Sequence, residues 1–268
     1  MRKLLLILFS LSVLLIACND NHNTKPNLSL SIKSINDTTE ILKKFFSPVK
    51  IVNKNLAVWK PDMDDYFNMV ISDDSTCKTK IDTIITLTHQ KYIIIFRTDG
   101  YYNSGKKRDC HVCSPIYGIA SIEKQDSTYN ILNFKKNLIA AGSFGSGYDT
   151  LQIEKFGHDF QLLRITSSYV GTSTETLTNT YFDVNGYKQL FSYWPYRTVG
   201  DSAELDTQYT KIEQQLIHIP GKEFKERDDI KLLGYFTTYD EKQKKFIRRN
   251  QTEYYRADAF GNYKRALQ

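Results

Sequence analysis

The sequence contains few of the residues that usually mark a catalytic or metal-binding protein, and it has almost no long hydrophobic run. Its 268 residues include 5 His, 4 Cys, 2 Trp and 6 Pro. Beyond the N-terminus no apolar stretch approaches the roughly 20 residues of a membrane-spanning helix, which argues against a polytopic membrane protein. The net charge of +6 is too small to indicate a nucleic-acid partner.

The composition that remains is that of an ordinary globular protein. Hydrophobic residues make up 41% of the chain and charged residues 25%, which excludes wholesale disorder and a fibrous chain. Tyrosine and phenylalanine are abundant, with 18 and 15 copies. These residues favour β-strands, where their rings pack against neighbouring strands.

The N-terminus has the organisation of a secretory signal peptide. Arg2 and Lys3 form a short basic region, and an apolar run extends from Leu4 to Ile16 with two serines inside it. This run is too short to span a membrane, but it is typical of a cleaved export signal. We therefore predict that residues 1–17 are a signal peptide.

The end of this segment, Leu15-Ile16-Ala17-Cys18, resembles the lipobox of bacterial lipoproteins. The resemblance implies cleavage before Cys18 and acylation of that residue, for example with palmitate. Several acyl chains on one residue give stable anchoring, whereas a single chain is marginal. The protein is thus expected in the bacterial cell envelope, held to a membrane through Cys18. The outer membrane is favoured, and either the periplasmic or the surface face is possible.

The rest of the chain divides into a tether and a folded body. Residues 18–33 comprise the lipidated cysteine and a polar segment with one proline, which indicates a linker. Residues 34–268 are expected to form a single mainly-β domain, with a subdivision near residues 198–209 as the alternative. A short helix is expected over residues 36–47, capped by Asn36 or Asp37 and ended by Pro48.

After the helix the hydrophobic pattern has a period of two, which is typical of strands. The continuously apolar run Tyr92–Phe96 predicts a central strand buried on both faces. Asn185-Gly186 predicts a hairpin with a type I′ turn. Few helical crossovers separate the runs, so the fold class is antiparallel meander sheets, sandwich or barrel-like. The predicted strands cover residues 55–59, 66–72, 81–88, 92–97, 117–124, 129–135, 150–156, 160–167, 175–182, 187–193, 212–219, 230–239 and 245–257.

One compact group of reactive residues stands out, in the segment Cys110-His111-Val112-Cys113-Ser114-Pro115. In an oxidising compartment, Cys77, Cys110 and Cys113 offer a structural disulfide, and this is the favoured interpretation. A redox pair of Cys110 and Cys113 is the alternative, although no thioredoxin-like context accompanies it. Ser114 excludes haem attachment, because that motif needs histidine there. The segment also resembles short stretches of uncharacterised secreted bacterial proteins, which implies no activity.

No familiar catalytic or nucleotide-binding motif is present. The glycine-rich stretch Gly142–Gly147 lacks the Lys-Ser/Thr of a phosphate-binding loop, and the serine-hydrolase and zinc-protease signatures are absent. We predict no metal and no cofactor. The aromatic cluster around Trp194 and Tyr196 could contact a ligand, although such residues more often pack a β core.

The expected function is therefore a binding or assembly role at the cell envelope, with an envelope protein or a glycan as the partner and no nucleic acid. The alternative is an envelope enzyme. That enzyme would be a thiol oxidoreductase acting through Cys110 and Cys113, or a hydrolase whose acidic residues follow no recognisable spacing.

Overall fold

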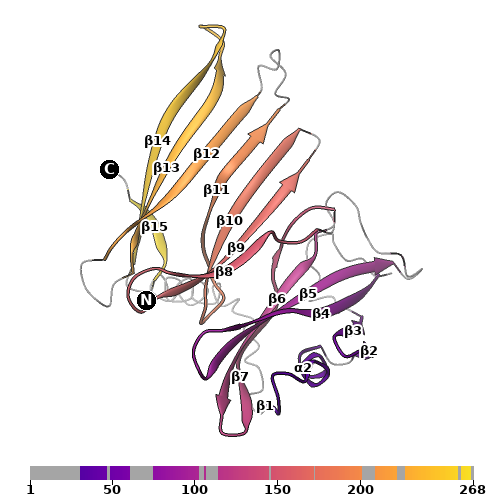
Figure 1. Cartoon of the computed structure of the whole chain (residues 1–268). Coiled ribbons are helices and arrows are strands. Elements are labelled where there is room, and N and C mark those ends of the chain that lie inside the picture. Colours follow the sequence, from indigo (N-terminus) through magenta and orange to yellow (C-terminus); the bar gives the residue numbers. More distant parts are fainter. Residues whose placement is uncertain are drawn as a thin grey trace, which may run out of the picture.

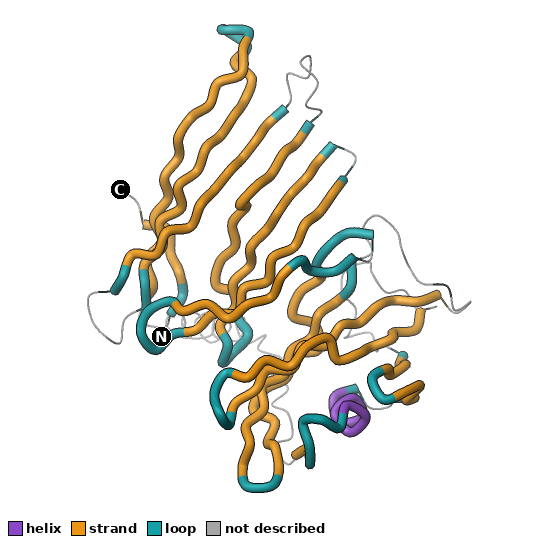
Figure 2. Tube along the Cα trace, viewed as in Figure 1, coloured by secondary structure: helices purple, strands orange, loops and turns teal. Residues whose placement is uncertain are grey.

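The computed structural model describes residues 31–46, 49–60, 75–102, 106, 114–144, 146–171, 173–200, 209–221, 227–258 and 261–266. These residues form two antiparallel sheets and one short helix (Figures 1 and 2). The mainly-β, antiparallel fold class predicted from the sequence is confirmed, and the architecture includes a half-barrel. The predicted strand at residues 66–72 lies outside the described residues.

Both sheets are meanders in which most neighbouring strands are also neighbours in sequence. Sheet A has the order β1 (Ser31–Ile32), β7 (Thr128–Ala140), β6 (Ile116–Gln125), β5 (Lys91–Tyr102), β4 (Ser75–Thr86), β3 (Leu56–Trp59) and β2 (Lys50–Asn53). Sheet B has the order β15 (Tyr263–Ala266), β14 (Lys245–Ala257), β13 (Asp229–Asp240), β12 (Thr210–Ile219), β11 (Gln189–Val199), β10 (Thr174–Asp183), β9 (Gln161–Val170) and β8 (Thr150–Lys155).

The helix α2 (Thr38–Phe45) covers one face of sheet A. Asp37 is its N-cap, and the Asp37 carboxylate accepts a hydrogen bond of 2.9 Å from the Glu40 amide. This bond satisfies one of the amides that a helix start leaves without an intrahelical partner. The buried side chains of α2 are Ile41, Leu42 and Phe45, and they pack into the same core as Phe96 of β5.

Strand β5 lies at the centre of sheet A and is buried on both faces, as the sequence predicts. Ile94 and Phe96 pack into the core beneath α2. Ile93 and Ile95 point the other way, into a core shared with Leu163 and other residues of sheet B. Because successive side chains of a strand alternate between faces, one apolar run serves both cores. Sheet A is thus the middle layer between α2 and sheet B (Figure 1).

Sheet B curls at one end until its last strand meets a strand from its middle. The ring of Tyr263 on β15 lies 5.1 Å from that of Phe191 on β11, although three strands separate β15 from β11 in the sheet. Phe156 and Tyr181 pack into the same buried cluster. This curvature gives the half-barrel its closed end, while the other ends of β9 to β14 spread apart (Figure 1).

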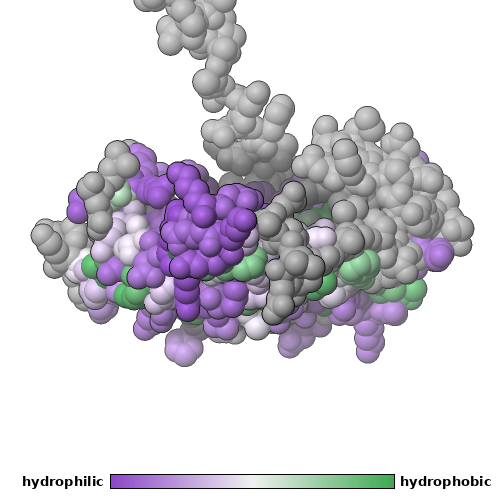
Figure 3. Space-filling view, turned by 90° about the horizontal axis from the view of Figure 1, so that it is seen from above, coloured by the Kyte–Doolittle hydropathy of each residue, from purple (hydrophilic) through white to green (hydrophobic). Residues whose placement is uncertain are grey.

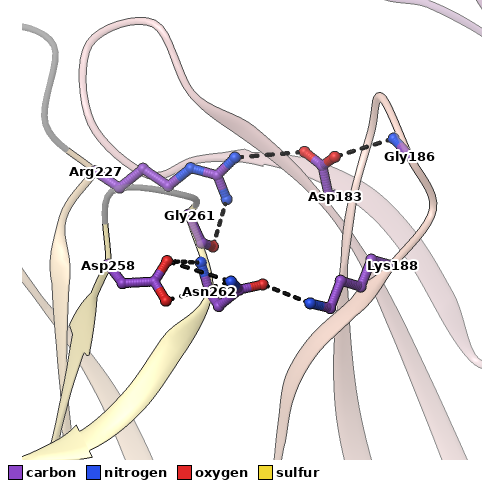
Figure 4. A network of polar contacts seen from close by, with 7 residues as sticks. All are labelled: Asp183, Gly186, Lys188, Arg227, Asp258, Gly261 and Asn262. Carbon is purple, nitrogen blue, oxygen red and sulfur yellow. Dashed lines mark hydrogen bonds and ion pairs between the residues drawn. The ribbon is translucent and has the colours of Figure 1, made fainter. Parts of the chain in front are cut away.

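A polar seam locks this closed end (Figure 4). Arg227 donates to the Gly261 carbonyl at 3.0 Å and pairs with the Asp183 carboxylate at 3.5 Å. Lys188 donates to the Asn262 side chain at 2.7 Å. The seam therefore joins the β10–β11 hairpin to the segments before β13 and before β15.

Gly261 is the residue that lets this seam form. Its φ of +76° belongs to the left-handed region, which side chains of L-residues rarely adopt. A Cβ atom at this position would stand 2.5 Å from the guanidinium carbon of Arg227. Both the backbone conformation and the close approach of Arg227 require glycine.

The predicted hairpin at Asn185-Gly186 is present, but its predicted type I′ turn is wrong. The positive φ falls on Tyr187, at 56°, and not on Asn185 or Gly186. The Asp183 side chain accepts a hydrogen bond from the Gly186 amide at 3.0 Å, and the Tyr187 amide donates to the Asp183 carbonyl. These bonds stabilise a four-residue loop in place of the two-residue turn.

Two further comparisons with the sequence concern boundaries. Strand β1 falls within the segment predicted as a tether, and Ile32 is fully buried against sheet A. Residues 201–208, in the predicted subdivision, lie outside the described residues. On either side of them, Val199 and Thr210 are paired within sheet B. The proposed division of the chain into domains stays a prediction.

Candidate binding surface

One face of sheet B carries rows of aromatic and charged side chains across β11 to β14. The register places Tyr196, Glu213, Tyr235 and Asn250 side by side in one row. Residues directly opposite each other in antiparallel strands point to the same face. We call this surface the aromatic face, and its members are Tyr196, Tyr209, Lys211, Glu213, Tyr235, Thr237, Tyr239, Phe246, Arg248 and Asn250.

Cations lie over the aromatic rings of this face. The Arg248 guanidinium is 4.0 Å from the centre of the Tyr235 ring, and the Lys211 ammonium is 5.6 Å from that of Tyr196. Such contacts contribute about 0.5–1 kcal/mol at exposed sites. They hold the cationic groups against the sheet, so the side chains of this face are partly ordered before any partner arrives.

Glu213 links the two cations. Its carboxylate lies 3.0 Å from Lys211 and 3.5 Å from Arg248. The hydrogen bond to Glu213 raises the pKa of Lys211 above its ordinary value, so this lysine remains charged at neutral pH. The Glu213 side chain in the pair with Lys211 is more than a third exposed, so this ion pair adds little to the stability of the fold. Its main effect is to order the side chains of the aromatic face.

The free ends of the strands extend this face with a second aromatic group. Phe246 lies directly opposite Tyr239, and its ring contacts those of Tyr239 and Tyr209 at 5.3 and 5.8 Å. Phe246 is 38% exposed and Tyr235 is 42% exposed. Seen from above, the described surface is mostly hydrophilic, with hydrophobic residues in small separate groups (Figure 3). On the aromatic face itself, the polar side chains of Glu213 and Asn250 stand on either side of Tyr235.

The two aromatic residues that the sequence pointed to, Trp194 and Tyr196, lie on opposite faces of sheet B. Tyr196 belongs to the aromatic face. The Trp194 ring instead lies 4.4 Å beneath the guanidinium of Arg197, whose side chain alternates with that of Tyr196. Pro195 stands between them at a register shift, where a residue without an N–H group is tolerated. The two rings therefore do not form one contact site.

The cysteines can be placed only in part. Cys77 is fully buried on β4, opposite Gly100 of β5, near the point where the chain leaves β5 toward Cys110. Cys18, Cys110 and Cys113 lie outside the described residues, so the predicted lipidation, disulfide and redox pair stay predictions. Just after this segment, the Ser114 hydroxyl donates to the Gly142 carbonyl at 2.5 Å.

A second polar cluster lies where the two sheets meet. Arg97 pairs with Asp99 at 3.2 Å and donates to the Ser146 carbonyl at 3.2 Å. The Tyr148 hydroxyl donates to the Asp82 carboxylate. Each charge here has an internal partner, which indicates a structural joint.

The pKa shifts in this joint have clear causes. Burial and then the hydrogen bond to Asp82 raise the pKa of Tyr148 well above its ordinary value. Burial also raises the pKa of Tyr117. Burial alone would lower the pKa of Arg97, but its hydrogen bond to Asp99 and the surrounding charges raise it overall. At neutral pH the phenols are therefore neutral and the guanidinium is charged.

A surface hollow of about 400 Å³ beside the start of α2 is lined by Ser34, Asn36, Asp37, Thr38, Thr39 and Lys54. Its single carboxylate, that of Asp37, already caps the helix. Within the described ranges, no group of three or more His, Cys, Asp or Glu side chains is placed to hold a metal ion. None of the described helices is long and apolar enough to cross a membrane.

The described residues define an architectural class: a mainly-β protein of two antiparallel sheets with a half-barrel and an exposed aromatic face. Comparisons with protein-family models, curated proteins and solved structures find no match for this chain.

Most residues of the aromatic face could not be identified from the sequence. The one available signal was the alternation of Phe246, Arg248 and Asn250 with other residues along the predicted strand at 245–257. That alternation separates two faces but does not say which neighbours share them. Only the register of β11 to β14 brings Tyr196, Tyr235 and Arg248 together.

Proposed function

We propose that this protein is a lipid-anchored bacterial envelope protein that binds a partner through the aromatic face of sheet B. The observation that carries the proposal is the set of exposed rings and ordered cations on that face. Tyrosine and arginine are enriched at protein interfaces and supply much of their binding energy. Side chains that are ordered in advance also lose less entropy on binding.

The anchor rests on the resemblance of Leu15-Ile16-Ala17-Cys18 to a lipobox. Labelling of cells with a palmitate analogue tests it. We expect label on the full-length protein and complete loss of label in a Cys18→Ser variant. Label that persists in this variant would remove the anchor from the proposal while leaving the binding face untouched.

The binding role can be tested with two adjacent threonines of β13. Thr237 lies on the aromatic face, opposite Arg248, and Thr238 lies on the other face, opposite Ile247. The two have the same chemistry and occupy the same strand, and both are partly exposed. A photoreactive amino acid at either position of the full chain, expressed in cells, compares the two faces directly.

We expect a discrete cross-linked product from position 237 and none from position 238. The product from position 237 should weaken when Tyr235 is changed to alanine, because that ring belongs to the same face. Equal products from both positions, or none from position 237, would overturn the proposal.

A further inference from the structure

The outer edge of β14 is largely unpaired. Strand β15 pairs only with Tyr254–Ala257, at the closed end of the half-barrel. Toward the free end, Lys245–Glu253 has no strand partner on that side among the described residues. Unpaired strand edges present backbone groups that can accept another strand.

This edge is also regular. The ladder between β13 and β14 runs from Ile230↔Tyr255 to Asp240↔Lys245 without a register shift. Strand β7 of sheet A also extends beyond its two pairs with β1, but its ladder with β6 contains two register shifts. Bulges of that kind disturb an edge and discourage pairing. The ladder between β14 and β13 contains no such bulge, so β14 presents an undisturbed edge.

The backbone groups at the edge can be assigned. The Ala257 amide donates to the Asp229 side chain on β13 at 3.2 Å, so it points away from the edge. Backbone groups of successive residues in an antiparallel strand point to opposite sides. The N–H and C=O groups that point to the open edge are those of Phe246, Arg248, Asn250 and Thr252.

The side chains of these residues connect the edge to the aromatic face. Phe246, Arg248 and Asn250 all belong to that face, and the rows of Arg248 and Asn250 extend across β13 and β12 to β11. A strand paired with β14 would place alternate side chains next to Arg248 and Asn250. Pairing at the edge would therefore widen the aromatic face.

The edge is cationic. Strand β14 contains four basic residues and one acidic residue. The acidic residue, Glu253, is 13% exposed and pairs with Arg265 at 3.1 Å. Arg248 and Arg249 also pair with acids, Glu213 at 3.5 Å and Asp240 at 3.7 Å, but their side chains are 58% and 69% exposed. The charge available to a partner is therefore positive.

We propose that β14 is the docking edge for an extended acidic segment of a partner protein, which adds to sheet B as a further strand along Lys245–Glu253. This inference rests on the proposed binding function and names the partner's chemistry. In β-strand addition, main-chain hydrogen bonds supply affinity and side chains supply specificity. A second copy fits less well, because two β14 edges would bring like charges together.

The probe is a synthetic peptide of alternating glutamate and threonine, added to the full chain in detergent. Amide hydrogen exchange is measured for β14. We expect slower exchange at Phe246, Arg248, Asn250 and Thr252, by about tenfold at a peptide concentration ten times its Kd. Absence of protection at peptide concentrations up to about 1 mM, the weak end of specific recognition, would overturn the proposal.

Two controls separate strand addition from simple attraction between charges. A peptide of alternating lysine and threonine should give no protection. The variant Asn250→Pro removes an amide that points to the open edge and leaves the hydrogen bonds to β13 in place. It should therefore fold but no longer bind the peptide. Thr252→Pro provides a second test of the same kind if Asn250→Pro does not fold. If the acidic peptide binds a folded proline variant as tightly as it binds the wild type, the proposal is overturned.

Arginine variants test where the charge acts. Arg248→Gln should weaken peptide binding several-fold more than Arg249→Gln, because only Arg248 lies on the aromatic face. Equal effects would contradict the assigned face. Sedimentation that shows self-association through the edge, abolished by Asn250→Pro, would favour a second copy and overturn the acidic partner.

The experiment distinguishes this inference from the proposed function. If Asn250→Pro folds and leaves the cross-link at position 237 unchanged, the face binds its partner without the edge, and the inference alone fails. If position 237 gives no product in any variant, the binding function itself fails.

Discussion

Strands β5 and β14 have almost the same length, yet they occupy opposite environments. β5 has 12 residues and lies at the centre of sheet A, where its side chains from Ile93 to Phe96 are fully buried. β14 has 13 residues and forms most of the outer edge of sheet B, where all of its side chains are exposed or partly exposed. The comparison shows that a strand covered on both faces supplies buried core, whereas a strand with an open face and an open edge supplies accessible surface.

The two strands differ in the side chains that they carry. A strand covered on both faces is a continuous apolar run, as in Tyr92–Phe96, whereas Phe246–Asn250 mixes aromatic, apolar and charged residues. The predictions that follow compare matched positions in the buried and exposed regions. They run from the largest expected effect to the smallest.

The largest contrast is expected between Phe96 and Phe246. Phe96→Ala should lower the free energy of unfolding by about 3–5 kcal/mol, because it removes a fully buried ring that contacts Phe45 of α2. Phe246→Ala should change it by less than about 1 kcal/mol, because that ring is already partly exposed. Urea unfolding monitored by circular dichroism measures both, and similar losses would contradict the comparison.

A second contrast concerns two glycines of sheet B. Gly261→Ala should cost about 2–3 kcal/mol, because it requires a left-handed backbone and displaces Arg227 from the seam. Gly234→Ala is the control, since its Cβ would meet neighbours only at 3.4 Å. Thermal unfolding of both variants measures the effect. A Gly261→Ala variant as stable as Gly234→Ala would show that the seam does not hold the closed end.

A third test uses alkaline pH. Burial and the hydrogen bond to Glu253 raise the pKa of Tyr255 to about 12, and burial and Asp82 raise that of Tyr148. Because both folded-state values lie above the unfolded value of about 10, their stabilisation is complete below pH 10 and is lost as pH rises beyond it. Each phenol should cost at most about 1.4 kcal/mol by pH 11, and less where solvent reaches the ring.

The measurement is the free energy of unfolding between pH 8 and pH 11 for the wild type and for Tyr148→Phe. The variant should show a shallower decline, because it lacks one of the titrating phenols. An identical decline in the two proteins would mean that Tyr148 titrates alike in the folded and unfolded states.

The smallest effect is expected at Glu213. Glu213→Gln removes the link between Lys211 and Arg248, but these groups are exposed, so stability should change by no more than about 0.5 kcal/mol. Asp99→Asn is the less exposed counterpart, since Arg97 and Asp99 are each 16% exposed, and it should cost about 1–3 kcal/mol. Chemical unfolding at low and high salt compares them, and equal costs would contradict the distinction between the two regions.

The sequence predicts the local features of this fold better than the long-range ones. The period-two pattern identifies the strands, and Tyr92–Phe96 identifies the central one, because burial on both faces leaves a direct mark in the sequence. The type I′ turn prediction fails because the Asp183 side chain stabilises a different loop. Strand β15, at Tyr263–Ala266, is missed because it is short and its pairing depends on β14.

The candidate surface was less accessible to sequence reasoning. The sequence singled out Tyr196 as a possible ligand contact but grouped it with Trp194, from which a register shift and the alternation of the strand separate it. Its neighbours on the aromatic face, Glu213 opposite it and Lys211 over its ring, come from the next strand. Register between strands is set by packing and by loops, and residue types alone do not specify it.

The seam at the closed end also sets the order in which the protein can fold. Arg227 reaches back 44 residues to Asp183 and forward 34 residues to Gly261. During synthesis, which proceeds from the N-terminus, sheet A can assemble while sheet B is still incomplete. The half-barrel can close only after Gly261 has emerged. A chain that stops before this residue would keep the buried core of sheet A but could not close the half-barrel of sheet B.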